Sequence, residues 1–544
     1  MEMLNLSLPA NNRFATEYLA QTPDMMQFFH YRYQNHSDYI ERLNELAGRE
    51  FNREKIADHI EYFMTKYPTS YAVDHSLSKL RQSNSVVVIG GQQAGVLTGP
   101  LYAVHKVISI IALAKQKESE LGIPVVPIFW IAGEDHDYAE VNHIFTEADQ
   151  KIEKMTYPQL VHGKKMVSDI SLDRELCDTW VKKIIESFGE TEYTKALLDF
   201  TAQAIEQSTT LVDFFAHIIM EMFKDFGLLI IDSGDMALRK LEQDYFQSII
   251  NNSQEITDAV LAQQAILQTC GYSNAIELKE TAANLFYYDE ESNSRILLEY
   301  QPETKLFIGK NHSLQFSYAD LIELSTEKPH LLSNNVVTRP LTQEWLFPTL
   351  AFIAGPGEIA YWSELKQAFE LFQIKLPPIV PRLNITLLER PIETDIAELG
   401  LSLEAVLKEG ISAPKEEFLH SVKDPELEQL FLKLNKEFSE QYEVIIEKIE
   451  EIDRGLNTLI KKNEQLIQKQ IRFLEDKVHE SIYQKHMVTL RKLDRIGNAL
   501  RPNGAPQERI LNPYYFLNKY GFEFIKQLVM LDYQFDGTHK VVKL

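Results

Sequence analysis

Short apolar runs alternate with longer amphipathic segments over the first 388 residues. The run Ser85–Gly90 (SVVVIG) lacks polar alternation, which is typical of a strand buried on both faces of a parallel sheet. Leu101–Leu121 repeats apolar residues at helical spacing and ends at a Gly-Ile-Pro stop, and Pro124–Gly133 is a second apolar run. Strand, helix and strand in about fifty residues predict a βαβ unit.

The same pattern recurs further along the chain, after a helical lead-in at 18–67. A predicted helix, Leu211–Phe226, precedes a strand beginning at Leu228. A further strand and glycine turn at Leu350–Glu358 precede a predicted helix, Ile359–Phe372, and the extended piece Pro377–Leu388 closes the pattern. We therefore predict an α/β parallel-sheet core over 1–388, with inserted segments at about 151–210 and 272–335, the second containing a hairpin at 285–300.

The pattern changes after residue 388. From Leu427 to Leu493, apolar residues recur at spacings of three and four among Glu, Lys and Gln, so we predict a helical coiled-coil domain over 389–500. Residues 414–455 hold 12 acidic and 6 basic side chains, whereas residues 456–501 hold 5 and 10. Opposite charges favour an antiparallel hairpin turning near Gly455 or an antiparallel dimer, and the alternative is one uninterrupted helix. The turn-rich, aromatic segment 501–544 should dock on folded protein, of its own subunit or a partner.

Composition narrows the function classes. The chain has 544 residues, 44% of them hydrophobic and 25% charged, as in globular proteins. A formal net charge of -24 argues against a general nucleic-acid binder. Two distant cysteines, Cys177 and Cys270, imply neither a disulfide framework nor a structural metal, and no metal site is expected. Without a signal peptide or an apolar run long enough for a membrane, the expected location is the cytoplasm.

The first candidate site is the glycine-rich segment Gly90–Pro100 between a strand and a helix. Backbone amides there suit an anion, and Gln92, Gln93 and Thr98 add side-chain donors. We predict that a phosphate or carboxylate is held by Gly91, Gln92, Gln93, Gly95 and Thr98. The segment matches neither a P-loop nor the dinucleotide fingerprint, and the alternative is a turn needed only for close packing. Whether His105 and Lys106 face the cleft stays open.

The second candidate follows the next strand, where α/β folds place their ligands. Trp130 and Glu134 are predicted to contact substrate, and the predicted catalytic group consists of Asp135, His136 and Asp137. A carboxylate that receives an amine proton or orients an amine, with the imidazole polarising a carboxylate, suits these residue types better than a metal does. The alternative is a loop of solvated charges in which Asp135 or Asp137 caps a helix.

Two further candidates lie later in the chain. The glycine turn Gly355–Gly357 should line the same crevice, with four predicted ligand contacts: Arg339, Glu358, Tyr361 and Trp362. Trp362 as a core aromatic is an equal alternative. A donor-rich turn in the tail is a possible nucleotide site, formed by Arg501, Asn503, Gly504, Gln507 and Arg509, with a structural clamp as the alternative.

In combination, several segments resemble the BshC family, to which the cysteine-adding step of bacillithiol biosynthesis is assigned. They are GGQQAGVLTGPLYAVHK, PIFWIAGEDHDYAEVNH, GPGEIAYW, the coiled coil and PNGAPQER. The resemblance implies a Rossmann-like, nucleotidyltransferase-type core with inserted connecting segments and a coiled coil that forms a homodimer. It also implies a ligase that adds L-cysteine to glucosaminyl-malate to give bacillithiol.

Forming this amide requires an activated cysteine carboxyl, so ATP or another nucleotide is the expected cosubstrate. The chain has neither the HIGH and KMSKS signatures nor a P-loop, which weakens the ATP assignment without affecting the fold. The alternative function is a non-catalytic nucleotide-binding scaffold that assembles partners through its coiled coil.

Overall fold

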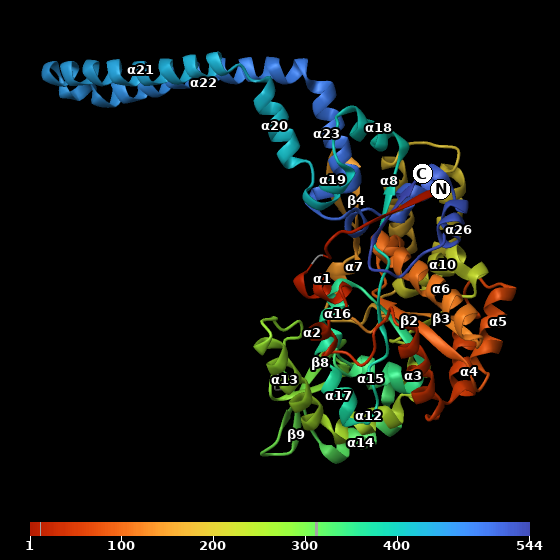
Figure 1. Ribbon diagram of the computed structural model, residues 1–544. Helices are drawn as coiled ribbons and strands as arrows, with labels where there is room; N and C mark the ends of the chain where they lie inside the picture. Colours follow the sequence, from red (N-terminus) through yellow and green to blue (C-terminus); the bar gives the residue numbers. More distant parts are fainter. Residues whose placement is uncertain (11, 149, 311–313) are drawn as a thin grey trace. The chain divides into compact units, whose positions relative to one another are not determined.

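The computed structural model describes residues 1–10, 12–148, 150–310 and 314–544 (Figure 1). It divides into two compact units. The core unit comprises Met1–Leu388 together with Ala505–Leu544, and the helical unit comprises Glu389–Gly504. The two units are described separately below.

A five-stranded parallel sheet forms the centre of the core unit. Its spatial order is β13-β12-β2-β3-β6, and every neighbouring pair is parallel. The strands are β2 (Val86–Gln92), β3 (Val125–Ile131), β6 (Leu229–Asp232), β12 (Thr349–Ala354) and β13 (Ile379–Pro381). Numbered along the chain, this is the 3-2-1-4-5 order of Rossmann folds, which reverses direction between β2 and β12. The predicted Rossmann-like parallel core is confirmed.

Helices pack on this sheet through apolar faces. The longest, α6 (Leu101–Leu121), has the predicted bounds and contacts both β2 and β3, so it is the crossover of the first βαβ unit. Other helices of the core unit contact strands of the sheet: α3 (His36–Ala47), α4 (Arg53–Met64) and α5 (Tyr71–Leu80). The segment α10 (Leu211–Phe223) is also helical as predicted and is almost wholly buried.

The inserted segments form structure of their own. One contains the hairpin of β4 (His143–Ala148) and β5 (Lys151–Thr156), followed by α8 (Arg174–Ser187) and α9 (Thr194–Gln207). The other contains the predicted hairpin, β7 (Ala282–Asp289) and β8 (Ser294–Gln301), within a five-stranded sheet of order β10-β9-β8-β7-β11. Its remaining strands are β9 (Leu306–Gly309), β10 (Gln315–Ser317) and β11 (Leu332–Asn334).

The two ends of the chain meet in a third sheet. Strand β15 (His539–Lys543) lies between β1 (Glu2–Leu6) and β14 (Ile385–Leu388), and Figure 1 shows both termini there. Three tail helices precede β15: α24 (Gln507–Ile510), α25 (Pro513–Tyr520) and α26 (Glu523–Val529). The segments α24 and α26 contact α6, so the tail packs on the core of its own chain.

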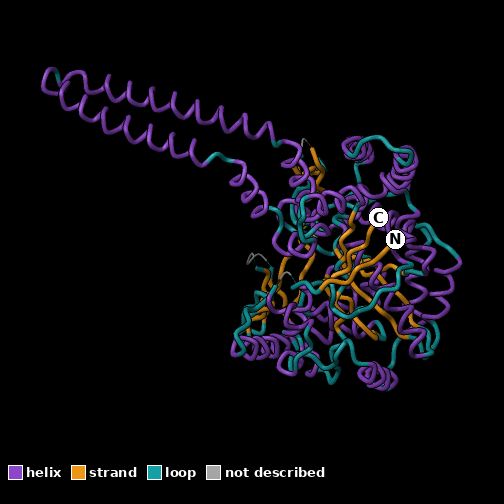
Figure 2. Tube along the Cα trace, turned by 45° about the horizontal axis from the view of Figure 1, so that its top comes forward, coloured by secondary structure: helices purple, strands orange, loops and turns teal. Residues whose placement is uncertain are grey.

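The helical unit contains an antiparallel hairpin. Its arms, α21 (Pro425–Ile452) and α22 (Asn457–Lys485), lie side by side in Figure 2 and are joined by the short turn η5 (Arg454–Leu456). Tyr442 on α21 donates its hydroxyl hydrogen to Asn463 Oδ1 on α22 at 2.7 Å. The chain therefore turns back at Gly455, and the alternative of one uninterrupted helix is wrong. The other helices are α18 (Arg390–Glu398), α19 (Leu403–Glu409), α20 (Ser412–Val422) and α23 (Met487–Leu500).

Two local predictions need correction. Gly90 and Gly91 belong to β2 rather than to the turn, because β2 pairs with β3 as far as Gln92. The predicted helix 359–372 is two helices, α16 (Pro356–Ser363) and α17 (Lys366–Leu371). In the part of the chain that the structure describes, no helix is both long and apolar enough to cross a membrane.

Candidate active site

A cleft of about 660 Å³ opens in the core unit at the carboxyl ends of its parallel strands. It lies at the reversal of strand order between β2 and β12, where open α/β sheets bind their ligands. Its lining combines the ends of four strands with the inserted sheet and the tail: Gly91, Gln92, Gln93, Tyr102, Lys106, Ala132, Glu134, Asp135, His136, Glu277, Phe286, Arg295, Leu297, Asn334, Asn335, Val336, Arg339, Gly355, Pro356, Gly357, Glu358, Tyr361, Arg382 and Arg509.

The end of β2 lines the cleft with Gly91 and Gln92. A Cβ on Gly90 would lie 3.1 Å from the Ile353 carbonyl oxygen, and one on Gly91 would lie 3.2 Å from that of Trp130. Both glycines therefore let neighbouring strands approach closely. Close packing was the alternative to anion binding for this segment. Gln93 lies beyond the strand and donates from Nε2 to Asp135 Oδ2 at 2.5 Å.

The turn itself lies beside the large cleft. Gly95 and Thr98 line a separate, smaller pocket, together with Gln92 and Gln93. The first amide of α6, that of Leu101, donates to the Leu511 carbonyl at 2.8 Å and is therefore not free for an anion. Asn512 in the tail also donates to two turn carbonyls. Among the predicted ligands of this segment, the structure brings only Gly91, Gln92 and Gln93 to the large cleft.

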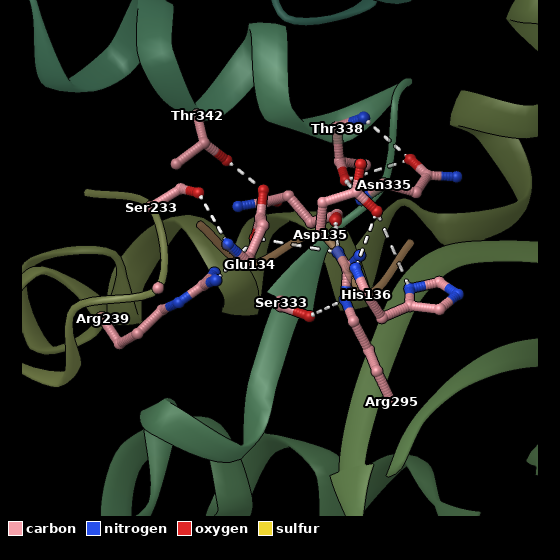
Figure 3. A network of polar contacts seen from close by, with 12 residues as sticks. Glu134, Asp135, His136, Ser233, Arg239, Arg295, Ser333, Asn335, Thr338 and Thr342 are labelled. Atoms are coloured by element: carbon pink, nitrogen blue, oxygen red, sulfur yellow. Dashed lines mark hydrogen bonds and ion pairs between the residues drawn. The ribbon is translucent and has the colours of Figure 1, made fainter. Parts of the chain in front are cut away.

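The loop after β3 places acidic and imidazole groups at the cleft (Figure 3). Glu134 is buried and accepts from Arg239 Nη2 at 2.5 Å, so it already has a cationic partner. Asp135 Oδ1 accepts from the backbone amide of His136 at 2.7 Å. Burial alone would raise the pKa of Asp135, but the Gln93 hydrogen bond and the charge of Arg295 hold that pKa below its usual value. Asp135 is therefore an oriented carboxylate.

His136 presents a neutral imidazole beside this carboxylate. Burial and the positive charge of Arg295 lower its pKa. Its Nδ1 lies 3.9 Å from Asp135 Oδ1 and has no hydrogen-bond partner among the described residues. The ring also packs edge-on against Phe286 with centroids 6.0 Å apart. A half-buried, uncharged histidine at a cleft is able to accept a proton from a substrate.

Three predicted site residues lie elsewhere. Asp137 is exposed and is not part of the cleft lining, because α7 (Tyr138–Val141) begins there and turns the chain away. Trp130 is buried in β3 against Phe347. Trp362 is fully buried against Phe352, which agrees with the alternative prediction of a core aromatic. Neither tryptophan lines the large cleft.

The turn after β12 holds Glu358 in place. Its Oε2 accepts from the Gly355 backbone amide at 2.6 Å and from Lys106 Nζ at 2.5 Å. Lys106 is buried and also donates to the Gly91 carbonyl at 2.6 Å. Burial lowers the pKa of this lysine, although Glu358 opposes the shift. Lys106 thus joins the ends of β2 and β12 across the point where the strand order reverses.

Half-buried Arg339 differs from Arg295 and Arg382, which are buried arginines at the cleft. Its Nη2 donates to the Tyr361 hydroxyl at 3.1 Å, and no carboxylate lies within ion-pair distance among the described residues. Burial opposes its charge, but Tyr361, Glu134 and Glu358 keep its pKa above the usual value. Burial also raises the pKa of Tyr361 to about 12. The guanidinium is therefore charged and available to a ligand anion.

The remaining cations come from three different segments. Arg295 on β8 lies over the Phe286 ring at 3.8 Å and donates to Ser333 Oγ at 2.8 Å, and burial lowers its pKa to about 10. Arg382 follows β13 and is held by both carboxylate oxygens of Glu508, at 2.7 and 2.6 Å. With Lys106, Arg339 and the exposed Arg509, five cationic side chains line the cleft, alongside the four carboxylates of Glu134, Asp135, Glu277 and Glu358. Sequence reasoning did not identify Arg295 or Arg382.

The predicted nucleotide turn in the tail is divided between the two units. Arg501, Asn503 and Gly504 belong to the helical unit, where Arg501 donates to the carbonyls of Leu407 and Gly504. In the core unit, Gln507 hydrogen-bonds the backbone of Leu387, which is a structural role. Arg509 alone of the five lines the cleft.

Comparisons with known proteins cover the whole chain. The family model "Bacillithiol biosynthesis BshC, N-terminal Rossmann-like domain" matches residues 1–383, and "Bacillithiol biosynthesis BshC, C-terminal coiled-coil domain" matches residues 385–544. The chain belongs to the BshC family.

Individual members of the BshC family align with the chain from end to end. The protein from Geobacillus sp. (strain WCH70) is 46% identical over 542 residues, and that from Geobacillus thermodenitrificans is 44% identical, with 100% of each chain covered in both cases. A third, from Bacillus cytotoxicus, is 41% identical over 544 residues with the same coverage. All three bear the name "Putative cysteine ligase BshC". The resemblance inferred from the sequence is thereby confirmed.

Proposed function

We propose that this chain is the ligase that joins the carboxyl group of L-cysteine to the amine of glucosaminyl-malate, giving bacillithiol. The observation that carries the proposal is the cleft itself. It sets a neutral imidazole beside an ionised carboxylate and surrounds them with cationic side chains. The relatives' names and the family descriptions support the same reaction.

The cations suit the charges that the substrates bring. Glucosaminyl-malate carries two carboxylates, and an activated acyl group carries phosphate, so both need positive partners. Arg339 has no carboxylate partner in the described part of the chain and is the first candidate to bind one of these anions, with Arg509 at the rim as the second. Glu134, Lys106 and Arg382 already have partners within the protein, so we assign them to shaping the cleft.

The residues after β3 suit the proton transfer that amide formation requires. A bond forms between the amine nitrogen and the cysteine carbonyl carbon, and the bond from that carbon to its activating oxygen breaks, with the leaving group taking the electron pair. The attacking amine must lose a proton, which His136 accepts in its neutral form. Asp135 is held by Gln93 and orients the amine or the imidazolium.

Activation of the carboxyl requires a cosubstrate, and we propose ATP or another nucleotide. The donor set fits phosphate groups, because arginine and lysine side chains supply several hydrogen-bond donors within one cleft. When bound, the nucleotide would supply a leaving group on the cysteine carboxyl. Gly91, Gln92 and Gln93 at the end of β2 would line its site.

Product formation tests this proposal directly. The purified chain is incubated with cysteine, glucosaminyl-malate and one nucleotide at a time, and bacillithiol is measured by mass spectrometry. The variant His136→Asn should lower kcat by about 10²-fold or more. The matched control is His162→Asn, at an exposed position outside the cleft. No product with any nucleotide, together with undiminished bacillithiol in cells lacking the gene, would refute the ligase.

The scaffold alternative makes the opposite prediction in cells. If the chain only assembles partners, His136→Asn should leave bacillithiol levels intact, whereas disruption of the hairpin should abolish them.

The hairpin exposes large apolar side chains, among them Val444 (55%) and Ile445 (48%). We therefore propose that the ligase is a homodimer in which the hairpin buries these side chains against a second copy. We also propose that it works in the cytoplasm.

A further inference from the structure

Two carboxylates and one imidazole meet between the arms of the hairpin in the helical unit. Glu428 lies in the first turn of α21, and Glu475 and His479 lie near the end of α22. One ligand atom from each residue lies within 4.8 Å of the other two. Among the residues that the structure describes, this is the only group of three or more His, Cys, Asp or Glu side chains with that geometry.

The helical backbone brings the three groups together. Glu475 and His479 are four residues apart on α22, so their side chains are neighbours on one face of the helix. Glu428 approaches from the opposite arm, with its Oε1 2.7 Å from His479 Nε2. These two side chains are 34% and 35% exposed, so an ion from solvent has access to them.

An ion pair between His479 and Glu428 accounts for only part of this arrangement. Glu475 is half-buried, yet it has no hydrogen-bond or ion-pair partner among the described residues. Lys423 Nζ lies 3.7 Å from Glu428 Oε1 and belongs to a flexible side chain, so it does not neutralise both carboxylates. Two carboxylates close together repel each other unless a cation lies between them. A cation bound between the arms would give Glu475 the partner that it lacks among the described residues.

The ligand types identify the class of cation. Calcium and magnesium prefer oxygen ligands throughout and usually six or more of them, which a group with one imidazole does not provide. Zinc accepts imidazole nitrogen and carboxylate oxygen, with three protein ligands and a water completing a tetrahedron. We propose that Glu428, Glu475 and His479 form a Zn²⁺ site that links the two arms of the hairpin.

The position of the site determines what it does. The turn near Gly455 closes one end of the hairpin, whereas Glu428, Glu475 and His479 lie towards the other end, where the arms join the rest of the unit. A metal link there closes the loop of residues 429–474 and so restricts the unfolded chain. Because the ion binds the folded hairpin and not its separated arms, it stabilises the folded form by mass action. The proposal is independent of the reaction assigned to the core unit.

Metal binding to the full-length chain tests the site. The protein is first freed of metal with a chelator. Zn²⁺ is then titrated by calorimetry, and Co²⁺ is followed by the visible absorption of its tetrahedral complexes. We expect one ion per chain, with affinity about tenfold or more weaker in Glu475→Gln and in His479→Ala. Zn²⁺ should also raise the midpoint of the helical signal on heating, and Glu475→Gln should remove that increase.

Two matched variants separate ligands from neighbours. Glu480→Gln changes an exposed carboxylate that pairs with Lys477 at 2.5 Å, and His420→Ala changes an exposed histidine in the same unit. Both should bind metal as the natural chain does. Glu475→Gln retains the contact between His479 and Glu428, so the hairpin stays folded while one ligand is lost. No uptake below about 100 μM, or an affinity unchanged in either ligand variant, would overturn the three-ligand site.

Discussion

Replacing Arg339 with Gln separates substrate binding from folding, because this guanidinium has no carboxylate partner among the residues that the structure describes. Its guanidinium donates a hydrogen bond to the Tyr361 hydroxyl at 3.1 Å. The substitution therefore breaks no ion pair with a buried carboxylate. The free energy of unfolding should change by less than about 1 kcal/mol. A buried pair such as Arg382 and Glu508 would cost several times more when broken.

The effect on catalysis should be much larger. A charge-assisted hydrogen bond contributes about 1.5–3 kcal/mol, and losing one to a substrate anion lowers kcat/KM by roughly 10- to 150-fold. If Arg339 binds a group that is unchanged during the reaction, the loss appears mainly in KM. Arg339→Lys keeps the charge but not the two-pronged geometry, so it should lie between the Gln variant and the natural enzyme.

The assay is initial-rate kinetics with each substrate varied in turn, using mass spectrometry to quantify bacillithiol. The substrate whose KM rises is the one whose anion Arg339 binds. Arg13→Gln is the matched control, because Arg13 is 69% exposed and pairs with Glu17 within its own helix. If Arg339→Gln keeps kcat and every KM within about twofold of the control, the assignment of this residue is wrong.

Three further predictions follow from other contacts. Glu508→Gln should destabilise the fold by about 3–5 kcal/mol, because it leaves a buried arginine without its counter-charge; urea unfolding midpoints measure this. Burial opposes the charge of Glu508, but the Arg382 charge holds its pKa below the usual value. The stabilisation from this carboxylate is therefore fully present above the unfolded pKa of about 4.3 and is lost only as pH falls towards the folded pKa. If the difference in unfolding free energy between the natural chain and Glu508→Gln shrinks between about pH 8 and 6, this reasoning is wrong. Gly95→Ala should destabilise the turn by about 1–3 kcal/mol in the same assay, because its Cβ would lie 2.8 Å from backbone, whereas Gly48→Ala, with 3.5 Å available, should be close to neutral. Ile445→Glu should convert the proposed dimer to a monomer in light scattering, and Gln441→Glu on the same arm should not; a chain that is monomeric before substitution would refute the dimer.

The strands of the central sheet could be predicted because burial on both faces leaves a simple trace in the sequence. Val86–Ile89 and Val125–Ile131 contain almost no polar residue, and the helix Leu101–Leu121 between them has clear stop signals. The sequence predicts a turn at Gly90 and Gly91 because glycine occurs more often in turns than in strands. Glycine is needed at these two positions because Ile353 and Trp130, which are distant in the sequence, approach the strand closely.

The candidate site could be predicted only where its residues lie in strand-end loops. Asp135, His136 and Glu358 follow apolar strands, so the topology rule located them. Arg295 lies within a hairpin of an inserted sheet, and Arg382 follows a short edge strand, so neither has a local pattern that signals function. A single sequence gives no measure of which distant segments meet, and two of the five cationic residues at the cleft, Arg295 and Arg382, depend on such meetings.

The tail is therefore part of the site rather than an appendage to the fold. Arg509 lies at the rim of the cleft, and its neighbour Glu508 neutralises Arg382 and contacts His105 on α6 at 3.1 Å. Leu511 accepts the hydrogen bond of the first amide of that helix. These contacts position the start of α6 from a segment about 400 residues away. Because the tail supplies a rim cation and the counter-charge of a second one, the electrostatics of the cleft depend on the chain being folded to its last strand.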